Sequence, residues 1–369
     1  METYKPNPGT PVADLDTPCL ILELDSLEHN FKVIADTYKD TDVKLRAHMK
    51  NVKSPMLAKM QMDIGGTVNG VCCAKVAEAE VMVQGGIDDI LIPNEIVTKD
   101  KIKRVCSLAH KAKIAVCVDN PQNLRDLSAQ ASASGVTLGV AIEVDTSMGR
   151  GGIRSPEEGV ELAKLATSLP GIHFKGVMSH QSLKGEGDKE TRYIEGRRYI
   201  QMCLDVRDAI EKAGIPVEYV STGETFTYDV ATEIPGITDV EGGTYALMST
   251  FLSYMTEFEY AGLMLGTVIS TPRPGVAIGD SGMRAVGAMC TYAEAWPVVH
   301  SPEGLTVSEM YDEQVVLTSK GAMPLKVGDK YFLRLGQQDV TVNRFDHYIG
   351  VRNGAVEAVW DIPARGCFH

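Results

Sequence analysis

Three ionisable side chains alternate within one short segment, Arg46-Ala47-His48-Met49-Lys50. This segment contains the end of an apolar run, Val43–His48, that is predicted to be a β-strand. Because side chains alternate along a strand, Arg46, His48 and Lys50 are expected to share one face. If that face lies inside a low-dielectric site, burial and the two neighbouring groups disfavour the charged ammonium of Lys50. A partly neutral lysine is nucleophilic and is suited to forming a Schiff base with an aldehyde.

Two simpler interpretations compete with this one. A lysine at the end of a strand commonly reaches into solvent and has no chemical role. Lys53 could also take the role, but by strand alternation it has the wrong parity, and it adjoins Ser54-Pro55. A serine followed by a proline is typical of the start of a helix, so Lys53 is expected on the surface.

A second candidate group follows the predicted strand Leu138–Val144. Arg150 has glycines on both sides, in the segment Gly149-Arg150-Gly151-Gly152. Glycine allows a tight turn, which could hold the guanidinium group over the same site as Lys50. The alternative is an ordinary loop arginine paired with Asp145.

Two later strand ends are rich in glycine and small hydroxyl residues. They are Ser221–Thr225 and Gly242–Tyr245. Backbone N–H groups and hydroxyls of this kind bind phosphate in many barrel proteins. Neither segment is a P-loop or a dinucleotide-binding fingerprint. Together with Lys50 they predict a phosphorylated cofactor that carries an aldehyde.

The elements that must position these residues form a repeating pattern. Eight short apolar runs are predicted as strands: Val43–His48, Thr67–Cys72, Ile90–Pro93, Ile114–Val118, Leu138–Val144, Lys175–Ser179, Val217–Ser221 and Thr238–Tyr245. The first five begin about 24 residues apart, and amphipathic stretches such as Pro156–Ser168 lie between them. Eight alternating strand and helix units predict an α/β fold with a closed (β/α)₈ barrel.

The pattern changes after about residue 265. Strand-like runs such as Glu313–Leu317 and Lys330–Leu335 are separated by turns, without a long helical period. This predicts an all-β C-terminal domain. The run Pro18–Glu23 precedes the first helix of the barrel and could join that domain. We therefore expect a barrel at residues 24–265 and a β-rich domain made of residues 1–23 and 266–369.

The composition excludes several classes of protein. The 369 residues carry a net charge of −13, which disfavours binding to nucleic acid or to an anionic membrane. Residues 1–16 lack the apolar core of a signal peptide, and no run is long enough to span a membrane. The eight cysteines lack metal-binding or disulfide spacing. We expect a cytoplasmic enzyme that acts on a small molecule.

The chain also resembles a known family. The segment Arg46–Lys53 is similar to the Arg-Pro-His-x-Lys-x-x-Lys motif of the D-threonine aldolase and D-serine dehydratase family, with alanine at the second position. Within that family it most resembles the 3-hydroxy-D-aspartate aldolases, through Gly70–Glu80, Asp89–Glu95, Asp339–Asn343 and Ala364-Arg365-Gly366. Members are fold-type III enzymes that use pyridoxal 5′-phosphate and have an alanine-racemase-like barrel. The resemblance extends from Thr17 to Gly366.

The resemblance implies a role for each matching residue. Lys50 would form the Schiff base, and Arg150 would face the pyridine nitrogen of the cofactor. His180 would act on the substrate as a base. The remaining residues expected around the cofactor, including those that would take its phosphate, are His48, Gln181, Thr222, Gly223, Gly243, Thr244 and Tyr245. The family also implies a homodimer.

One segment departs from the family pattern. Members place a histidine and an acid or thiol after a glycine of the β domain, where they bind a divalent metal such as manganese, magnesium or zinc. Here Gln337 replaces the histidine, although Asp339 remains. A glutamine carbonyl is a poor ligand for Mn²⁺ or Zn²⁺, and one acid alone binds metal weakly. His347 could supply the missing ligand.

The resemblance favours retro-aldol cleavage of a β-hydroxy D-amino acid, such as 3-hydroxy-D-aspartate or a D-threonine-like substrate, to glycine and an aldehyde or oxo acid. A dehydratase or ammonia-lyase of the D-serine or hydroxyaspartate type is an alternative that uses the same cofactor. A metal-independent racemase, with Tyr348 as its second base, is another. A non-catalytic carrier of the cofactor and an inactive paralogue are further possibilities. Carriers lack the β domain, which disfavours the first of these.

Overall fold

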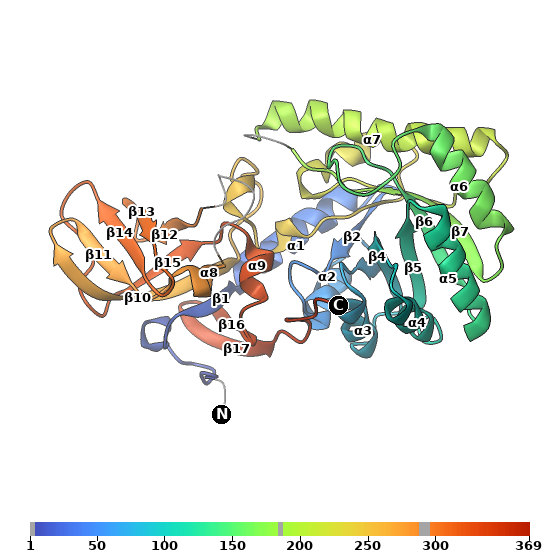
Figure 1. Cartoon of the computed structure of the whole chain (residues 1–369). Helices are drawn as coiled ribbons and strands as arrows, with labels where there is room; N and C mark the ends of the chain where they lie inside the picture. Colours follow the sequence, from blue (N-terminus) through green and yellow to red (C-terminus); the bar gives the residue numbers. More distant parts are fainter. Residues whose placement is uncertain (1–3, 184–186, 288–295) are drawn as a thin grey trace. The chain divides into compact units, whose positions relative to one another are not determined.

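The computed structural model describes residues 4–183, 187–287 and 296–369. Its internal contacts divide the chain into two compact units. The barrel unit consists of Ile34–Lys50, Ser54–Gly243 and Cys367–His369. The sheet unit consists of Met1–Val33, Asn51–Lys53 and Thr244–Gly366. Both units can be followed in Figure 1.

The barrel unit contains a closed barrel of parallel strands, which confirms the predicted fold class. The strands, in order, are β2 (Lys44–His48), β3 (Thr67–Cys72), β4 (Asp89–Glu95), β5 (Lys113–Val118), β6 (Leu138–Glu143), β7 (Ile172–Ser179), β8 (Tyr219–Thr222) and β9 (Asp239–Val240). Strand β9 pairs with β2 through Lys44 and Asp239, and this pairing closes the barrel.

The last of these strands is much shorter than predicted. The expected strand Thr238–Tyr245 is a strand only at Asp239–Val240, and Thr244–Ala246 forms a 3₁₀ turn. Gly242-Gly243 interrupts it, as expected for residues that lose much conformational freedom in a strand. The carbonyl of Gly242 still accepts a hydrogen bond from the N–H of His48 at 2.8 Å.

Helices alternate with the strands (Figure 1). They are α2 (Pro55–Ile64), α3 (Val76–Gln84), α4 (Lys99–Leu108), α5 (Pro121–Ser134), α6 (Pro156–Ser168) and α7 (Lys189–Lys212), while α1 (Leu24–Tyr38) belongs partly to each unit. Helix α6 has the predicted bounds, and the hydroxyl of Ser155 accepts a hydrogen bond from the N–H of Glu158. Proline begins α2 as expected, but the Ser54 side chain makes no capping bond.

The interior of the barrel is filled with side chains. One buried cluster takes one residue from each of strands β3 to β7: Cys72, Leu91, Cys117, Ala141 and Met178. Burial raises the pKa of both thiols in this cluster well above their usual value. The thiols therefore stay protonated, and they act as small core residues rather than as nucleophiles.

The sheet unit contains a sheet with the strand order β13-β14-β11-β10-β1-β16-β17, in which β15 pairs with both β10 and β12. Its strands are β1 (Cys19–Glu23), β10 (Gly262–Arg273), β11 (Val276–Gly279), β12 (Val298–Ser301), β13 (Leu305–Met310), β14 (Val315–Ser319), β15 (Lys330–Arg334), β16 (His347–Arg352) and β17 (Ala355–Asp361). Two short helices, α8 (Met283–Val286) and α9 (Gln338–Val342), accompany them.

The sequence-distant strand β1 lies inside this sheet. It pairs antiparallel with β10 and parallel with β16, through Ile21 opposite Leu263 and Ile349. By contacts, residues 24–33 and 244–265 also belong to the sheet unit, so its extent differs from the expected 1–23 and 266–369. A physical reason is Asn30, whose amide donates to the carbonyls of Ala246 at 3.2 Å and Glu259 at 2.8 Å.

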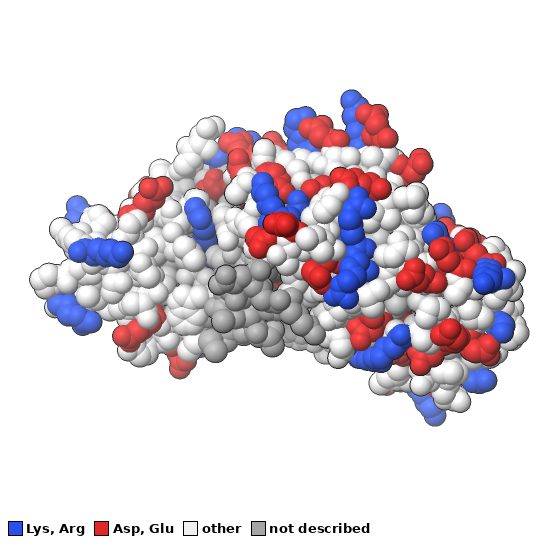
Figure 2. Space-filling model, turned by 90° about the horizontal axis from the view of Figure 1, so that it is seen from above, with Lys and Arg blue, Asp and Glu red and all other residues white. Residues whose placement is uncertain are grey.

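Acidic and basic side chains are interspersed over the described part of the face seen in Figure 2. Among the described residues, every helix is too short or too polar to cross a lipid bilayer.

Candidate functional site

Lys50 lies in a turn directly after strand β2 of the barrel unit. The backbone leading to it is held by two hydrogen bonds, from His48 N to Gly242 O and from Met49 N to Cys72 O, both 2.8 Å long. The side chain of His48 is buried, and its Nδ1 accepts a longer bond of 3.4 Å from the N–H of Lys50. The amine of Lys50 is therefore presented at the carboxyl end of the barrel by a fixed backbone.

Arg46 does not join Lys50, contrary to the expectation that three ionisable groups share one site. Its Nε donates to Asp239 Oδ2 at 3.0 Å, and its Nη1 donates to Asp89 Oδ1 at 2.8 Å. Both acids begin strands, at the opposite end of the barrel. Arg46 lies on the same face of the strand, but its long side chain points toward that other end.

His180 follows strand β7 and shares the site with Lys50. Its backbone carbonyl accepts a hydrogen bond of 3.5 Å from the hydroxyl of Thr146. Burial, and then the positive charges of Lys50 and Arg150, hold the pKa of His180 well below its usual value. The structure therefore brings these three predicted residues together, and the imidazole is neutral at physiological pH, so one ring nitrogen carries a free lone pair.

Arg150 does not pair with Asp145, the partner considered in the alternative interpretation. Its Nη2 lies 3.7 Å from Glu143 Oε1, while Asp145 Oδ2 pairs with Arg154 at 3.3 Å. The Arg150 side chain is 51% exposed, so its guanidinium remains accessible.

Three carboxyl residues near Arg150 were not among the residues predicted for the site. Glu95 ends β4, Asp119 follows β5, and Glu143 ends β6. Burial, and then the adjacent Glu95, raise the pKa of Glu143 to about 9. Glu143 is thus protonated at neutral pH. The position of Glu143 at the end of a predicted strand could have marked it as a candidate site residue. Its pairing with Glu95 could not be predicted, because it depends on how the barrel brings the two strands together.

A second hydrogen-bonded group connects β7 and β8. The Thr222 hydroxyl lies 2.7 Å from that of Ser179 and accepts a bond of 3.1 Å from Gln181 Nε2. Gln181 Oε1 in turn accepts a bond of 3.4 Å from Thr227. Gln181 and Thr222 are fully buried, so these bonds fix the start of the loop after β8.

Gly223 and Gly243 form the glycine-rich part of the site. Gly223 has a φ of 113°, and a Cβ there would come within 3.0 Å of Val240 Cγ1. The N–H of Gly243 donates to Thr225 Oγ1 at 3.3 Å, which brings the two loops side by side. Thr225 lies in a segment that the sequence singled out, although it was not among the expected cofactor residues. Backbone that glycine leaves uncovered can approach a phosphate closely.

Thr244 and Tyr245 belong to the sheet unit. Tyr245 is buried, and its ring packs against those of Phe31 and Phe258, with centroid separations of 6.3 and 6.0 Å. Burial raises the pKa of its hydroxyl. A role of these two residues in phosphate binding stays a prediction.

The residues expected to bind a metal also lie in the sheet unit. Gln337 precedes helix α9, and Asp339 lies in its first turn, where its Oδ1 accepts a bond of 3.0 Å from the N–H of Val340. His347 is buried, and burial lowers its pKa. Across the described ranges of the chain, no three histidine, cysteine or acidic side chains gather as a metal-binding group.

The structure also places Lys53 and Tyr348 differently from what their proposed roles would require. Lys53, expected on the surface, is buried in a left-handed conformation with φ of 51°, and its carbonyl accepts a bond from Ala364 N. The hydroxyl of Tyr348 is buried and donates to the carbonyl of Val52 at 2.8 Å. Burial raises the pKa of Tyr348 well above its usual value, so its hydroxyl stays protonated and cannot take up a proton.

Two family models match the chain. The model described as "Alanine racemase, N-terminal domain" matches residues 22–244. The model described as "Putative serine dehydratase domain" matches residues 261–351.

Individual proteins match over nearly the whole length. A 3-hydroxy-D-aspartate aldolase from Paracoccus denitrificans is 36% identical, over 97% of this chain and 94% of the relative. A D-threonine aldolase from an Arthrobacter species is 34% identical, over 97% and 95%. The crystal structure of D-threonine aldolase from Filomicrobium marinum superposes with a TM-score of 0.93, at 32% identity and full coverage of both chains.

Proposed function

The chain belongs to the alanine-racemase-like family that includes 3-hydroxy-D-aspartate aldolase and D-threonine aldolase, and on that basis we propose that it is a pyridoxal 5′-phosphate-dependent lyase. Its substrate would be a β-hydroxy D-amino acid, cleaved by a retro-aldol reaction to glycine and an aldehyde or oxo acid. The observation that carries this proposal is the grouping of Lys50, His180 and Arg150 at one end of a barrel that is similar to aldolases over its full length.

The residues of the barrel unit fit the cofactor. Lys50 offers an amine for its aldehyde, and Gly223 and Gly243 have no side chains that would keep a phosphate from the backbone of their loops. Bound there, pyridoxal phosphate would act as the electron sink that permits a bond to the substrate's Cα to break.

Arg150 would hold the pyridine side of the cofactor. A guanidinium does not give up its proton at physiological pH, so it would leave a ring nitrogen beside it unprotonated. Glu143 lies 3.7 Å away and would be neutral near pH 7, so it does not cancel the charge of Arg150. The weakened electron sink favours cleavage or elimination.

His180 would act on the substrate. As a neutral imidazole it would accept the proton of the β-hydroxyl while the Cα–Cβ bond breaks and the electron pair stays on Cα. A proton added at Cα then completes glycine, and the other fragment leaves with a carbonyl group.

The donor set does not fit the metal that the family resemblance implies. Gln337 and Asp339 provide one carboxylate and one amide, and no group of three ligands occurs in the parts of the chain that the structure describes. His180 would therefore accept the hydroxyl proton without the help of a metal-bound group.

The dehydratase alternative keeps some support. A D-threo-3-hydroxyaspartate dehydratase from a Delftia species is 27% identical over 74% of this chain. The racemase alternative needs a second base, and the proposed one, Tyr348, has its hydroxyl committed to the carbonyl of Val52. Identity above 30% over almost the whole chain to two aldolases favours retro-aldol cleavage over both alternatives.

Separate incubations with D-threonine, D-serine and 3-hydroxy-D-aspartate test the proposal. The expected products are glycine with acetaldehyde from D-threonine, or glycine with glyoxylate from 3-hydroxyaspartate. Oxaloacetate or pyruvate without glycine would assign elimination instead. Inversion at Cα without cleavage would assign racemisation.

A further inference from the structure

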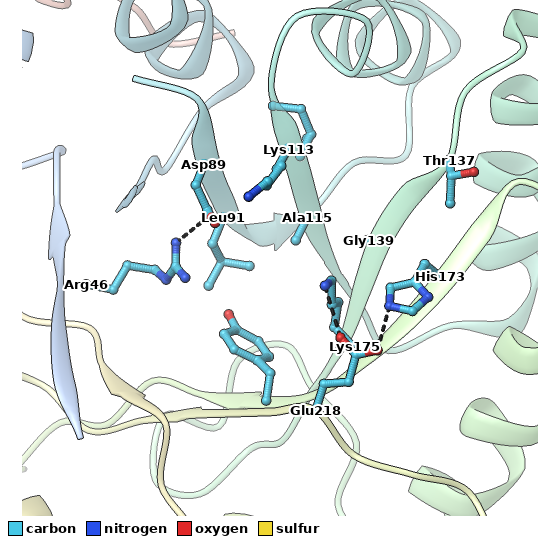
Figure 3. Close-up of a pocket in the computed structure, with 12 residues that line it drawn as sticks. Arg46, Asp89, Leu91, Lys113, Ala115, Thr137, Gly139, His173, Lys175 and Glu218 are labelled. Atoms are coloured by element: carbon cyan, nitrogen blue, oxygen red, sulfur yellow. Dashed lines mark hydrogen bonds and ion pairs between the residues drawn. The ribbon is translucent and has the colours of Figure 1, made fainter. Parts of the chain in front are cut away.

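A cavity of about 340 Å³ opens at the amino end of the barrel, the end opposite Lys50. Its lining comes from strands β2, β4, β5, β6, β7 and β8, through residues at or near their first positions. Figure 3 shows these side chains around the opening. All of the lining residues belong to the barrel unit.

One side of the cavity carries a buried arginine and an unpaired lysine. Arg46 is 8% exposed, and its Nε and Nη1 are bonded to Asp239 and Asp89. Its third nitrogen, Nη2, makes no hydrogen bond within the described chain. Lys113 is exposed and points toward the Arg46–Asp89 pair in Figure 3, yet no described residue bonds its amine. This side therefore offers two sets of N–H donors to a ligand.

The other side is electrically balanced. Glu218 accepts from Lys175 at 3.1 Å and lies 2.7 Å from His173 Nε2, as the dashed lines in Figure 3 show. The hydrogen bond from Lys175 is the main cause of the lowered pKa of Glu218. The charge of the Glu218 carboxylate is already balanced by Lys175, so this carboxylate does not favour a cationic ligand.

Between the two sides the surface is mostly apolar, and it is made by Leu91, Ile114, Ala115 and Gly139. Tyr219 also lines the cavity, and its buried hydroxyl has no hydrogen-bond partner among the described residues. Ala115 and Gly139 are small, which leaves space where larger side chains would otherwise fill the end of the barrel. Arg46, Lys113 and Lys175 outnumber the lining acids Asp89 and Glu218 by one, and Asp239, which is bonded to Arg46 from outside the lining, offsets that difference. An apolar surface beside N–H donors that lack a partner suits an anion with a hydrocarbon body.

We propose that this cavity binds a small organic carboxylate. Its carboxylate would accept hydrogen bonds from Lys113 Nζ and Arg46 Nη2, and its carbon skeleton would cover Leu91 and Ala115. The volume lies within the range of small-molecule pockets, about 300–1,000 Å³. This site is separate from Lys50, and the proposal stands whether or not the chain is an aldolase.

Calorimetric titration of the holoenzyme with benzoate and with its neutral isostere benzamide tests the proposal. Benzoate is expected to bind saturably and benzamide at least about tenfold more weakly, because benzamide lacks the charge. Lys113→Ala should weaken benzoate binding by about tenfold, and Lys113→Arg should restore it. The matched control is Lys111→Ala, which removes an exposed lysine two residues away that does not line the cavity.

Two further variants locate the binding. Ala115→Leu should fill the apolar surface and abolish benzoate binding, with thermal denaturation checking that the variant is folded. Lys50→Ala should leave benzoate binding unchanged, because Lys50 lies at the other end of the barrel. Equal binding of benzamide and benzoate, equal effects of Lys113→Ala and Lys111→Ala, or no saturable binding would each overturn the proposal.

Discussion

His180 shows how neighbouring charges can set the role of one side chain. An isolated histidine is half protonated near pH 6.5 and is then a poor base. Burial beside Lys50 and Arg150 disfavours the imidazolium, so the ring remains neutral at lower pH. This places a proton acceptor next to the amine that would hold the cofactor.

The variant His180→Gln keeps a polar side chain but cannot accept a proton. We expect kcat for retro-aldol cleavage to fall by about 10²–10⁴-fold, while the absorbance of the bound cofactor persists. Because the pKa of His180 is lowered, kcat/KM of the wild type should show no loss from this residue as the pH falls through 6.5. If kcat/KM of the wild type fell with decreasing pH near 6.5, and this fall disappeared in His180→Gln, the neutral state assigned to His180 would be contradicted.

The raised pKa of Glu143 leads to a prediction about how stability depends on pH. Its pKa rises from 4.5 to about 9 on folding, so the folded chain holds a proton that the unfolded chain releases between these values. The free energy of unfolding should therefore fall as the pH rises through this window, by at most about 1.4 kcal/mol per pH unit for one proton. Glu143→Gln, which stays neutral, should flatten that dependence.

Chemical denaturation between pH 5 and 9 measures the effect. Glu161→Gln is the control, because the Glu161 side chain is 74% exposed and lies away from strand ends. Parallel pH curves for the wild type and Glu143→Gln would show that Glu143 carries no shifted proton.

At the scale of elements, the ends of parallel strands explain why the reactive groups meet. Lys50 follows β2, Arg150 follows β6, and His180 follows β7, and the closed barrel brings these ends to one rim. The path of β7 depends on Gly176, which has a φ of 152°. A Cβ at this position would overlap the carbonyl oxygen of Tyr219 in the adjacent strand β8. Gly176 therefore permits the β7–β8 pairing that leads to His180.

Gly176→Ala should destabilise the protein by about 3 kcal/mol or more, because the strands must separate to admit the methyl group. Gly214→Ala provides the comparison, since Gly214 also has a positive φ, of 83°, but has no atom within 4 Å of the added Cβ. Gly214→Ala should lower the free energy of unfolding only by the strain of placing alanine in this conformation, about 1–2 kcal/mol. If Gly176→Ala and Gly214→Ala lowered the free energy of unfolding equally, in thermal or denaturant unfolding, the predicted clash with Tyr219 would be refuted.

For the molecule as a whole, the sequence predicts the repeating architecture well, because each strand and helix carries its own local pattern. The position of Lys50 after the first barrel strand follows from the same pattern. Individual side-chain pairs between distant segments could not be predicted, although the grouping of strand ends at one rim and the joining of Pro18–Glu23 to the β-rich domain could. Arg46 bonds to Asp239, 193 residues away, and this removes it from the site that strand alternation suggested. Glu95 and Glu143 meet only because the barrel brings their strands together.

The family resemblance also predicts a homodimer. Light scattering at micromolar concentration should give a mass of twice the 40.0 kDa of one chain. A mass equal to one chain at that concentration would contradict this prediction.

The most direct test of the account is borohydride reduction of the purified protein, followed by peptide mass spectrometry. The account predicts that reduction bleaches the absorbance of the bound cofactor and leaves the mass of a reduced pyridoxal phosphate adduct on Lys50. The same treatment of Lys50→Ala should leave no such adduct. An adduct on another lysine, such as Lys53, or none in the wild type, would contradict the central claim.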